Sequence, residues 1–574
     1  MRENAGCPSS TARSRRTSWP GFPSRSRSSP RRSTRSSSSW RSTRWRCKGA
    51  GCASGSSTSG AGNRIPGTPP SSAFRTSPRW PAWPWTSCSR RSTAGGNCAR
   101  RRPRSRPPST GPSCRGSDKE MPMAPARADL YRETFRPQFH FTARQWTVHK
   151  PNPGQREEGW INDLNGLVHH DGEYHLFAQR WARCWLHAIS TDLVHWTELQ
   201  PAFWDDDRFG TGVQSGGAVI DHRNTSGLSP DPKTPPMVAF WSGFDNFNTC
   251  ISYSLDKGRT WTKYAKNPIL RHPERDPKVL WHEPTRQWVM VLYGGGAYLF
   301  FTSPNLLDWT EQKDPIPHCY ECPDFFPLPI DGDLNRQKWV LVRGDGKYSL
   351  GEFDGRRFVE ETGQLVGDYG PNFYATMSWG EIAGQPGRRI QAAWMRCDGR
   401  QIYPDMPFNQ QISFPCDLTL RETNGTLRIF RTPVPEIEKL HGKKHAWKNL
   451  ALTPGAPKPL DAAGDLYRIL AEVEVPKDAE LVFRIRGTPV AVDEKTLACN
   501  CQPASASGGV RKLEILVDRT SIEVFANDGE ISITTCFTPT DADLAVECAK
   551  GSATVRSIEV IELESMWKGQ PRSE

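Results

Sequence analysis

The sequence predicts an all-β fold, a five-bladed β-propeller followed by a C-terminal β-sandwich. Three observations predict it: short apolar runs bounded by turn residues, a Trp that recurs after similar turns, and strict alternation around a late hairpin. The runs include YHLFAQ, MVAFWSG, WVMVLYGG and KWVLVRG, which are broken by Asp, Gly, Asn and Pro. Such runs are typical of strands, and no convincing amphipathic helix accompanies them.

The Trp repeat predicts the number of blades. The segments STDLVHW, SLDKGRTW and SPNLLDW end at Trp196, Trp261 and Trp309, and each follows an apolar run. The Trp residues are 65 and 48 positions apart, a spacing typical of a four-stranded blade with loops of variable length. Spread over residues 131–432, this spacing predicts about five blades. Each segment taken singly also fits an ordinary Asx turn before a strand.

A second domain follows the predicted propeller. Residues 433–459 are rich in Pro and Lys and are predicted to be a linker. In residues 460–565 the segment KLEILVDRTSIEVFANDGEISITTCF alternates apolar and polar positions around Asn527, Asp528 and Gly529. This pattern predicts a β-hairpin, and alternation on both sides of the turn favours a β-sandwich.

The charge is divided unevenly along the chain. Residues 1–120 hold 25 of the 75 Lys and Arg and 3 of the 62 Asp and Glu. The net charge is therefore +22 in this segment and −9 in the rest of the chain. This segment is rich in Arg, Ser and Pro, has no Leu or Val, and is predicted to be disordered. Arg/Ser runs with interleaved Trp also suit RNA binding. The favoured interpretation is mistranslation from the wrong reading frame, with the true start at Met121 or Met123 and no nucleic-acid partner.

Several other classes of function are not expected. The chain has no stretch of about 18 apolar residues and no signal-peptide core, so we expect no membrane partner. A leader lost with a misread start would imply a secreted or periplasmic protein; otherwise a cytoplasmic location is expected. Ten of the 16 Cys lie beyond residue 120 and are too scattered to indicate a disulfide framework. No metal or cofactor is expected, and the oligomeric state is left open.

Three acids are candidates for catalysis: Asp163 in WINDLNG, Asp276 in ERDPK and Glu321 in CYECPD. Each lies beside aromatic residues and rigid turns, where the inner strands of a propeller converge. Two carboxylates there can flank a glycosidic bond, one as nucleophile and one as proton donor, and a separation of about 5–5.5 Å implies retention of configuration. Any one of these acids is more often a turn former or an ion-pair partner. Spacing alone does not choose among them.

These segments closely resemble glycoside hydrolase family 32, the invertases, inulinases and levanases. Asp163 matches the nucleophile of the family's W-[M/I]-N-D-P-N-G motif, Asp276 the transition-state stabiliser of R-D-P, and Glu321 the general acid/base of E-C. The likeness continues through SGGAVIDHRNTSGL, SYSLDKGRTWTKYAKNPIL, GDYGPNFYATMSW and MPFNQQISFPCDLTL and covers most of residues 131–565. It implies the propeller and sandwich fold and an enzyme that releases fructose from levan or inulin, without metal or cofactor.

The resemblance also implies the substrate-binding residues. The fructose pocket would be lined by Asn162, Gln179, Trp181, Ser215, Arg275 and Trp394. The sequence departs from the family near them: Leu164 stands for the motif Pro, and Gly217 for a usual Ser. The segment FAQRWARCWLHA is shorter than its family counterpart, so a remodelled first-blade loop is expected. Two alternatives stay open: a fructosyltransferase or invertase on the same scaffold, and a catalytically weak sugar-binding propeller.

Overall fold

The computed structural model describes residues 131–144, 147–148, 155–156, 159–205, 212–243, 248–272, 274–397, 403, 406–423 and 425–568. In this part of the chain the regular structure is strand, apart from the 3-10 helix η1, Pro435–Leu440. For the described residues the prediction of an all-β fold is confirmed. None of the described helices has the length and apolar character needed to cross a membrane. Residues 1–120, predicted to be disordered, lie outside the described residues.

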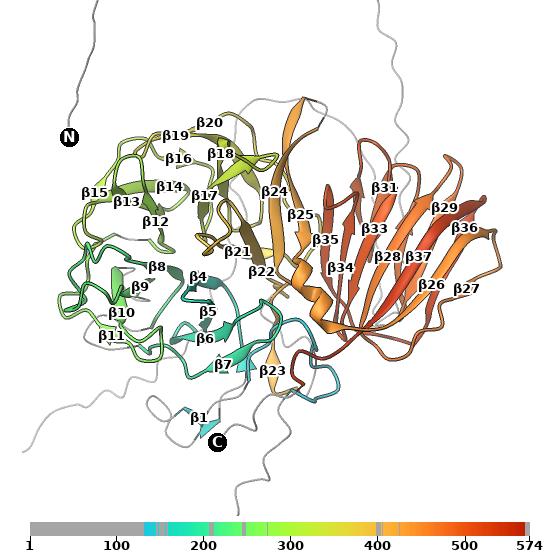
Figure 1. The fold of residues 1–574 in the computed structure, drawn as a ribbon, viewed down its shortest axis with the longest axis horizontal. Coiled ribbons are helices and arrows are strands. Elements are labelled where there is room, and N and C mark those ends of the chain that lie inside the picture. Colours follow the sequence, from blue (N-terminus) through green and yellow to red (C-terminus); the bar gives the residue numbers. More distant parts are fainter. Residues whose placement is uncertain are drawn as a thin grey trace, which may run out of the picture. The chain divides into compact units, whose positions relative to one another are not determined.

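Three antiparallel sheets, here called units 1 to 3, follow one another along the chain, each with its four main strands paired in sequence order (Figure 1). Unit 1 comprises β4 (Leu164–His170), β5 (Glu173–Arg180), β6 (Cys184–Ser190) and β7 (Thr197–Leu199). Unit 2 comprises β8 (Gly216–Ile220), β9 (Met237–Ser242), β10 (Thr249–Ser254) and β11 (Thr262–Lys263). Unit 3 comprises β12 (Lys278–His282), β13 (Gln287–Tyr293), β14 (Ala297–Ser303) and β15 (Thr310–Glu311), with β16 (Ile316–Pro317) also paired to β14.

Two further four-stranded units share one eight-stranded sheet, in which a single parallel pair, Ile330 with Leu420, joins them. Unit 4 comprises β17 (Asp324–Ile330), β18 (Asp333–Val342), β19 (Tyr348–Phe353) and β20 (Phe358–Glu360). Unit 5 comprises β21 (Tyr374–Trp379), β22 (Arg389–Trp394), β24 (Cys416–Thr423) and β25 (Thr426–Pro433). Two short ladders pair β1 (Thr147–Val148) with β2 (Gln155–Arg156) and β3 (Gly159–Trp160) with β23 (Phe408–Asn409).

The internal repeat is confirmed at atomic detail. Trp196, Trp261 and Trp309 each donate their indole N–H to the carbonyl three residues earlier, at 3.0, 2.9 and 2.9 Å. Each turn also holds a Ser hydroxyl that donates to the acid or amide two residues on, as from Ser254 to Asp256 at 2.7 Å. The three turns connect the third and fourth strands of units 1, 2 and 3. The repeated sequence is therefore a repeated structure.

The first strands of the five units lie against one another. Strand β4 contacts β8, β8 contacts β12, β12 contacts β17, β17 contacts β21, and β21 contacts β4. The approach is close enough to require glycine, because a Cβ on Gly166 would lie 2.2 Å from the Ala218 Cβ. A Cβ on Gly217 would lie 2.9 Å from the Pro277 carbonyl oxygen. In this chain there is therefore little room for a Ser side chain at position 217.

The C-terminal part forms two six-stranded sheets that share one apolar core. The predicted hairpin is present: β34 (Ser521–Ala526) pairs with β35 (Ile531–Cys536) through a four-residue turn, 527–530, in which Asn527 and Asp528 have φ angles of +51° and +58°. The first sheet comprises β26 (His441–Leu452), β37 (Ala553–Leu563), β28 (Tyr467–Glu474), β33 (Lys512–Val517), β34 (Ser521–Ala526) and β35 (Ile531–Cys536). The second comprises β27 (Lys458–Pro459), β36 (Leu544–Lys550), β29 (Glu480–Ile485), β30 (Thr488–Val492), β31 (Thr496–Cys499) and β32 (Gln502–Ser505).

The predicted linker at residues 433–459 differs from the structure. Most of it is regular: η1 is followed by β26, which pairs with β37 along its length. Strand β26 lies at the edge of its sheet, and most of its side chains are exposed or half-buried. An edge strand of this kind lacks the apolar alternation by which a strand is predicted. In the structure the two-sheet part therefore starts at His441 rather than at residue 460.

A buried charged network joins the two-sheet part to the segment before unit 1. His140 Nδ1 lies 2.9 Å from Asp518 Oδ2, and His140 Nε2 lies 2.8 Å from Glu523 Oε2, with all three side chains fully buried. The backbone N–H groups of Gln138, Phe139 and His140 also donate to Asp518 at 2.8 to 3.0 Å. We call these residues the His140 network.

Candidate active site

The three predicted acids all lie at the start of a unit's first strand. Asp163 directly precedes β4, Asp276 lies two residues before β12, and Glu321 lies three residues before β17. The other two first strands begin in a similar way, since Ser215 directly precedes β8 and Tyr374 opens β21. Because these strands contact one another, their leading ends gather side chains from all five units.

A relay of hydrogen bonds leads through the predicted substrate-binding residues to Asp163. Asn162 Nδ2 donates to Gln179 Oε1 at 2.9 Å, and Gln179 Nε2 donates to Ser215 Oγ at 2.7 Å. Ser215 Oγ then donates to Asp163 Oδ2 at 2.7 Å. The backbone supports the relay, because Gln179 N donates to the Asp163 carbonyl at 2.8 Å. The relay therefore fixes the orientation of the Asp163 carboxylate, because its members lie in or close to β-strands.

Cys322 brings the three acids together. Its backbone N–H donates to Asp276 Oδ2 at 3.0 Å, and its Sγ lies 3.7 Å from the same oxygen. The Cys322 thiol also hydrogen-bonds to Asp163. The charges of Asp163, Asp276 and Glu321 all act on the Cys322 thiol, so the three carboxyl groups meet around this one buried residue.

Glu321 is held by a cation and a phenol. Arg275 Nη2 donates to Glu321 Oε1, and the Tyr374 hydroxyl donates to Glu321 Oε2 at 2.5 Å. The Tyr298 hydroxyl donates to the backbone carbonyl of Glu321 at 2.6 Å. The Glu321 side chain keeps 21% of its surface exposed, so a ligand can reach it. The carboxyl group is therefore both oriented and accessible.

Burial and neighbouring carboxylates raise the pKa values of Asp163 and Asp276. Burial, together with the charge of Glu321, raises the pKa of Asp163, although the hydrogen bond from Ser215 opposes this. Burial raises the pKa of Asp276 to about 7, against the lowering influence of the Arg275 guanidinium, and the charges of Asp163 and Glu321 add to the rise. Below neutral pH Asp276 therefore retains a proton.

The backbone at two of the acids is strained. The φ angles are +64° at Asp276, +44° at Glu321 and +40° at Cys322. Residues with a Cβ rarely adopt this left-handed region, and such strain persists only where the surroundings enforce it. The strained residues are the same ones that bring the acids together. This coincidence indicates a functional constraint.

Aromatic side chains border the acids. Trp160 donates its indole N–H to Asn162 Oδ1 at 2.8 Å and stacks on Trp181, with ring centroids 4.6 Å apart. Trp181 is 40% exposed and presents its ring to solvent. Trp394 is buried, donates to Gln410 Oε1 at 3.0 Å and lies edge-on to Tyr374. Together with the relay and Cys322, these contacts place all nine predicted site residues in one neighbourhood.

Sequence reasoning missed Tyr374, whose hydroxyl contacts an acid directly. Tyr374 lies in GDYGPNFYATMSW, a segment quoted above only for its likeness to the family, and its role needed the pairing with Glu321 to be visible. After Gln179, in the segment where a remodelled loop is expected, Trp181 and Ala182 both have positive φ, at +57° and +51°. Leu164, where the family has Pro, is fully buried and pairs with Ala178.

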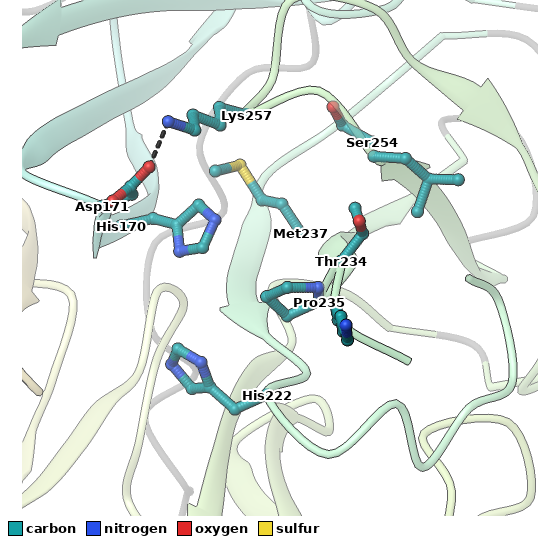
Figure 2. A pocket seen from close by; sticks show the side chains of 10 residues that line it. His170, Asp171, His222, Thr234, Pro235, Met237, Ser254 and Lys257 are labelled. Atoms are coloured by element: carbon teal, nitrogen blue, oxygen red, sulfur yellow. Dashed lines mark hydrogen bonds and ion pairs between the residues drawn. The ribbon is translucent and has the colours of Figure 1, made fainter. Parts of the chain in front are cut away.

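A separate cavity of about 460 Å³ lies at the other end of the same strands (Figure 2). His170 ends β4, which begins next to Asp163, so a seven-residue strand of roughly 20 Å separates the cavity from the acids. Asp171 and Lys257 form an ion pair at its edge, and His222 faces it from the loop after β8. No group of three or more His, Cys, Asp or Glu in the described part of the chain is arranged to hold a metal ion.

Comparisons with known proteins agree with this geometry. The profile of the glycosyl hydrolases family 32 N-terminal domain matches residues 155–430, and that of the family 32 C-terminal domain matches residues 436–562. A levanase from Bacillus subtilis (strain 168) is 36% identical over 508 residues, which cover 78% of this chain and 73% of the levanase.

Two solved structures are also similar to this chain. The exo-inulinase of Aspergillus awamori superposes with a TM-score of 0.65 at 25% identity, covering 76% of this chain and 100% of that one. A fructofuranosidase from Schwanniomyces occidentalis in complex with fructose gives a TM-score of 0.64 at 25% identity, covering 75% and 98% of the two chains.

Proposed function

Because the chain belongs to glycoside hydrolase family 32, we propose that it hydrolyses β-fructans such as levan or inulin and releases fructose, with sucrose as a further substrate. The observation that carries the proposal is the meeting of Asp163, Asp276 and Glu321 around Cys322 at the leading ends of the first strands. The levanase and exo-inulinase relatives support this substrate class.

In the proposed reaction Asp163 is the nucleophile. Its carboxylate attacks the anomeric carbon of a fructosyl residue while Glu321 gives its proton to the departing oxygen. Glu321 then accepts a proton from water, which attacks the covalent intermediate and releases fructose. The hydrogen bond from Ser215 supports the role of Asp163, because it helps to keep that carboxylate ionised and oriented.

Asp276 and Arg275 are proposed to stabilise the transition state. The Arg275 guanidinium lies beside Asp276 and pairs with Glu321. Both Arg275 and Asp276 present groups that can hydrogen-bond the hydroxyls of a sugar. Such bonds accelerate the reaction if they strengthen as positive charge develops on the sugar ring. Asn162, Gln179 and Trp394 are proposed to line the fructose subsite, and Trp181 to stack on the substrate.

We also propose that units 1 to 5 form a closed five-bladed propeller and that the two C-terminal sheets form a β-sandwich. The succession of contacts from β4 through β21 and back to β4 supports closure. The shared apolar core of the two six-stranded sheets supports a sandwich. In this proposal each of the five four-stranded units is one blade.

The test is the release of free fructose from levan, inulin and sucrose, compared between wild type and Asp163→Asn. Asp171→Asn, at the far end of β4, is the matched control and should keep wild-type activity. Longer oligosaccharides formed from concentrated sucrose would favour a transferase instead. Levan binding without any fructose release would favour a sugar-binding protein and overturn the proposal.

A further inference from the structure

Two cysteines from distant parts of the chain meet between unit 5 and the two-sheet part. Cys397 follows β22, Cys536 ends β35, and the Cys397 thiol is hydrogen-bonded to the Cys536 thiol. Among the nine free cysteines in the described residues, these two are partly exposed and the other seven are buried. A reagent from solvent can therefore reach this pair more readily than the other seven.

Two amide side chains hold the pair in place. Asn372 Nδ2 donates to Cys397 Sγ at 3.1 Å, while Asn372 Oδ1 accepts the backbone N–H of Cys536 at 2.8 Å. Gln411 Nε2 donates to Cys536 Sγ at 3.6 Å and to Met395 Sδ at 3.3 Å, two residues before Cys397. The two thiols are thus positioned from both sides, which favours bond formation over independent modification.

We propose that Cys397 and Cys536 are a modification site, at which a low-molecular-weight disulfide such as oxidised glutathione links unit 5 covalently to the two-sheet part. The sequence expectation that the cysteines form no disulfide framework is compatible with this single bond. The proposal is independent of the fructan-hydrolysing function, because neither cysteine belongs to the acid cluster.

The chemistry balances with glutathione disulfide as the oxidant. The Cys397 thiolate attacks one glutathione sulfur, which forms a mixed disulfide and releases one glutathione thiolate. The Cys536 thiolate then attacks Cys397 Sγ and releases the second glutathione thiolate. The two protein thiols are oxidised to one disulfide, glutathione disulfide is reduced to two thiols, and the two cysteine protons pass to the released thiolates.

The Cys397 thiol reacts first. The hydrogen bond to Cys397 and burial raise the pKa of Cys536 well above its usual value, so this thiol is a poor first nucleophile. Cys536 reacts once the mixed disulfide places an activated sulfur beside it. The bond closes a loop from residue 397 to residue 536, and closure of a long loop restricts the unfolded chain.

The experiment treats the full chain with oxidised glutathione, blocks the remaining thiols with N-ethylmaleimide and digests it without reduction. We expect a peptide containing Cys397 joined to one containing Cys536 in the mass spectrum. We also expect the thermal unfolding midpoint to rise by several degrees and to return to its original value after dithiothreitol.

Cys397→Ser and Cys536→Ser are the informative variants, with Cys250→Ser as the matched control for a buried cysteine elsewhere. Cys250→Ser should still form the link, and both other variants should lose it and the rise in midpoint. Their unfolding under reducing conditions should match wild type, which separates a missing link from a folding defect. Separate glutathione adducts on both cysteines of wild type, or full labelling of both by N-ethylmaleimide, would overturn the proposal.

Discussion

Asp276 in the acid cluster and Asp518 in the His140 network are both buried aspartates, 5% and 0% exposed, yet their protonation is opposite. Burial raises the pKa of Asp276 to about 7, and the nearby carboxylates add to the rise despite Arg275. Burial acts in the same direction on Asp518, but the hydrogen bond and charge of His140 and the backbone N–H donors outweigh it and lower the pKa. The partners, rather than the depth of burial, decide the outcome.

The difference separates two uses of buried charge. In the His140 network each carboxylate has a cation and several donors, so the charges hold two parts of the chain together. In the acid cluster Arg275 pairs with Asp276 and Glu321 but not with Asp163, so the arrangement stays reactive and adds little to stability. Substitutions that remove one charge at a time from each region test this contrast.

The largest expected effect is on catalysis. Asp163→Asn and Glu321→Gln should each lower kcat by at least about a thousandfold, because they remove the nucleophile or the proton donor. Asp518→Asn should leave kcat per folded molecule near the wild-type value. The measurement is fructose release from levan, corrected for the folded fraction. Asp163→Asn activity within tenfold of wild type would contradict the contrast.

The same Asp→Asn change should have different effects on stability in the two regions. Asp518→Asn removes one of the two buried counter-charges of His140 and should destabilise the protein by about 3–5 kcal/mol. Asp276→Asn relieves crowding among like charges and should be neutral or stabilise by about 1 kcal/mol. Urea unfolding of both variants at pH 7 measures this difference. Equal destabilisation by the two changes would show that burial alone sets the stability.

The two regions should also change the stability of the protein in different pH ranges. Burial alone would lower the pKa of His140, but its hydrogen bonds to Asp518 and Glu523 outweigh this and raise it to about 9. A pKa raised on folding gives stability that is complete below pH 6.5 and is lost as pH rises through 9, a change of about 3 kcal/mol. By the same rule, the raised pKa of Asp276 gives stability that is complete below about pH 4 and is lost as the pH rises to about 7.

Thermal midpoints from pH 4 to 10 check these ranges. His140→Gln should flatten the decline between pH 6.5 and 9, and Asp276→Asn should flatten the decline at lower pH. A wild type that is more stable at pH 9.5 than at pH 6.5 would refute the assignment of His140.

The smallest expected effect concerns a single phenol. Tyr374→Phe removes the hydrogen bond to Glu321 Oε2 and should lower kcat about tenfold, since a bond to a charged group is worth about 1.5–3 kcal/mol. The control is Tyr403→Phe, whose hydroxyl donates to the Thr520 carbonyl at 2.9 Å, away from the acids. It should lower the thermal midpoint without changing kcat. Equal losses of kcat in both variants would contradict a specific role of Tyr374.

The sequence predicted features that depend on local chemistry. The turns ending at Trp196, Trp261 and Trp309 depend on residues within a few positions, and the structure confirms their repetition. The Asn527–Asp528 hairpin follows from residues that tolerate positive φ. The three acids were selected by family motifs, since spacing alone gave three equivalent candidates, and their catalytic roles remain a prediction.

Other features depend on contacts between distant residues. His140 is 378 positions from Asp518, and nothing in either segment marks the other as its partner. The hydrogen bond from Tyr374 to Glu321 and the pairing of Cys397 with Cys536 are long-range in the same way. Strand β26 was missed for a different reason, because its mostly polar side chains suit an edge and resemble a linker.

The docking of residues 138–140 onto Asp518 has a consequence for biosynthesis. During translation the backbone N–H groups of Phe139 and His140 leave the ribosome nearly 380 residues before the carboxylate that accepts them. At about 5–20 residues per second, this interval is roughly 20 to 75 seconds. Throughout that time these N–H groups lack their native acceptor, so this contact between the two parts forms only after the C-terminal third has emerged.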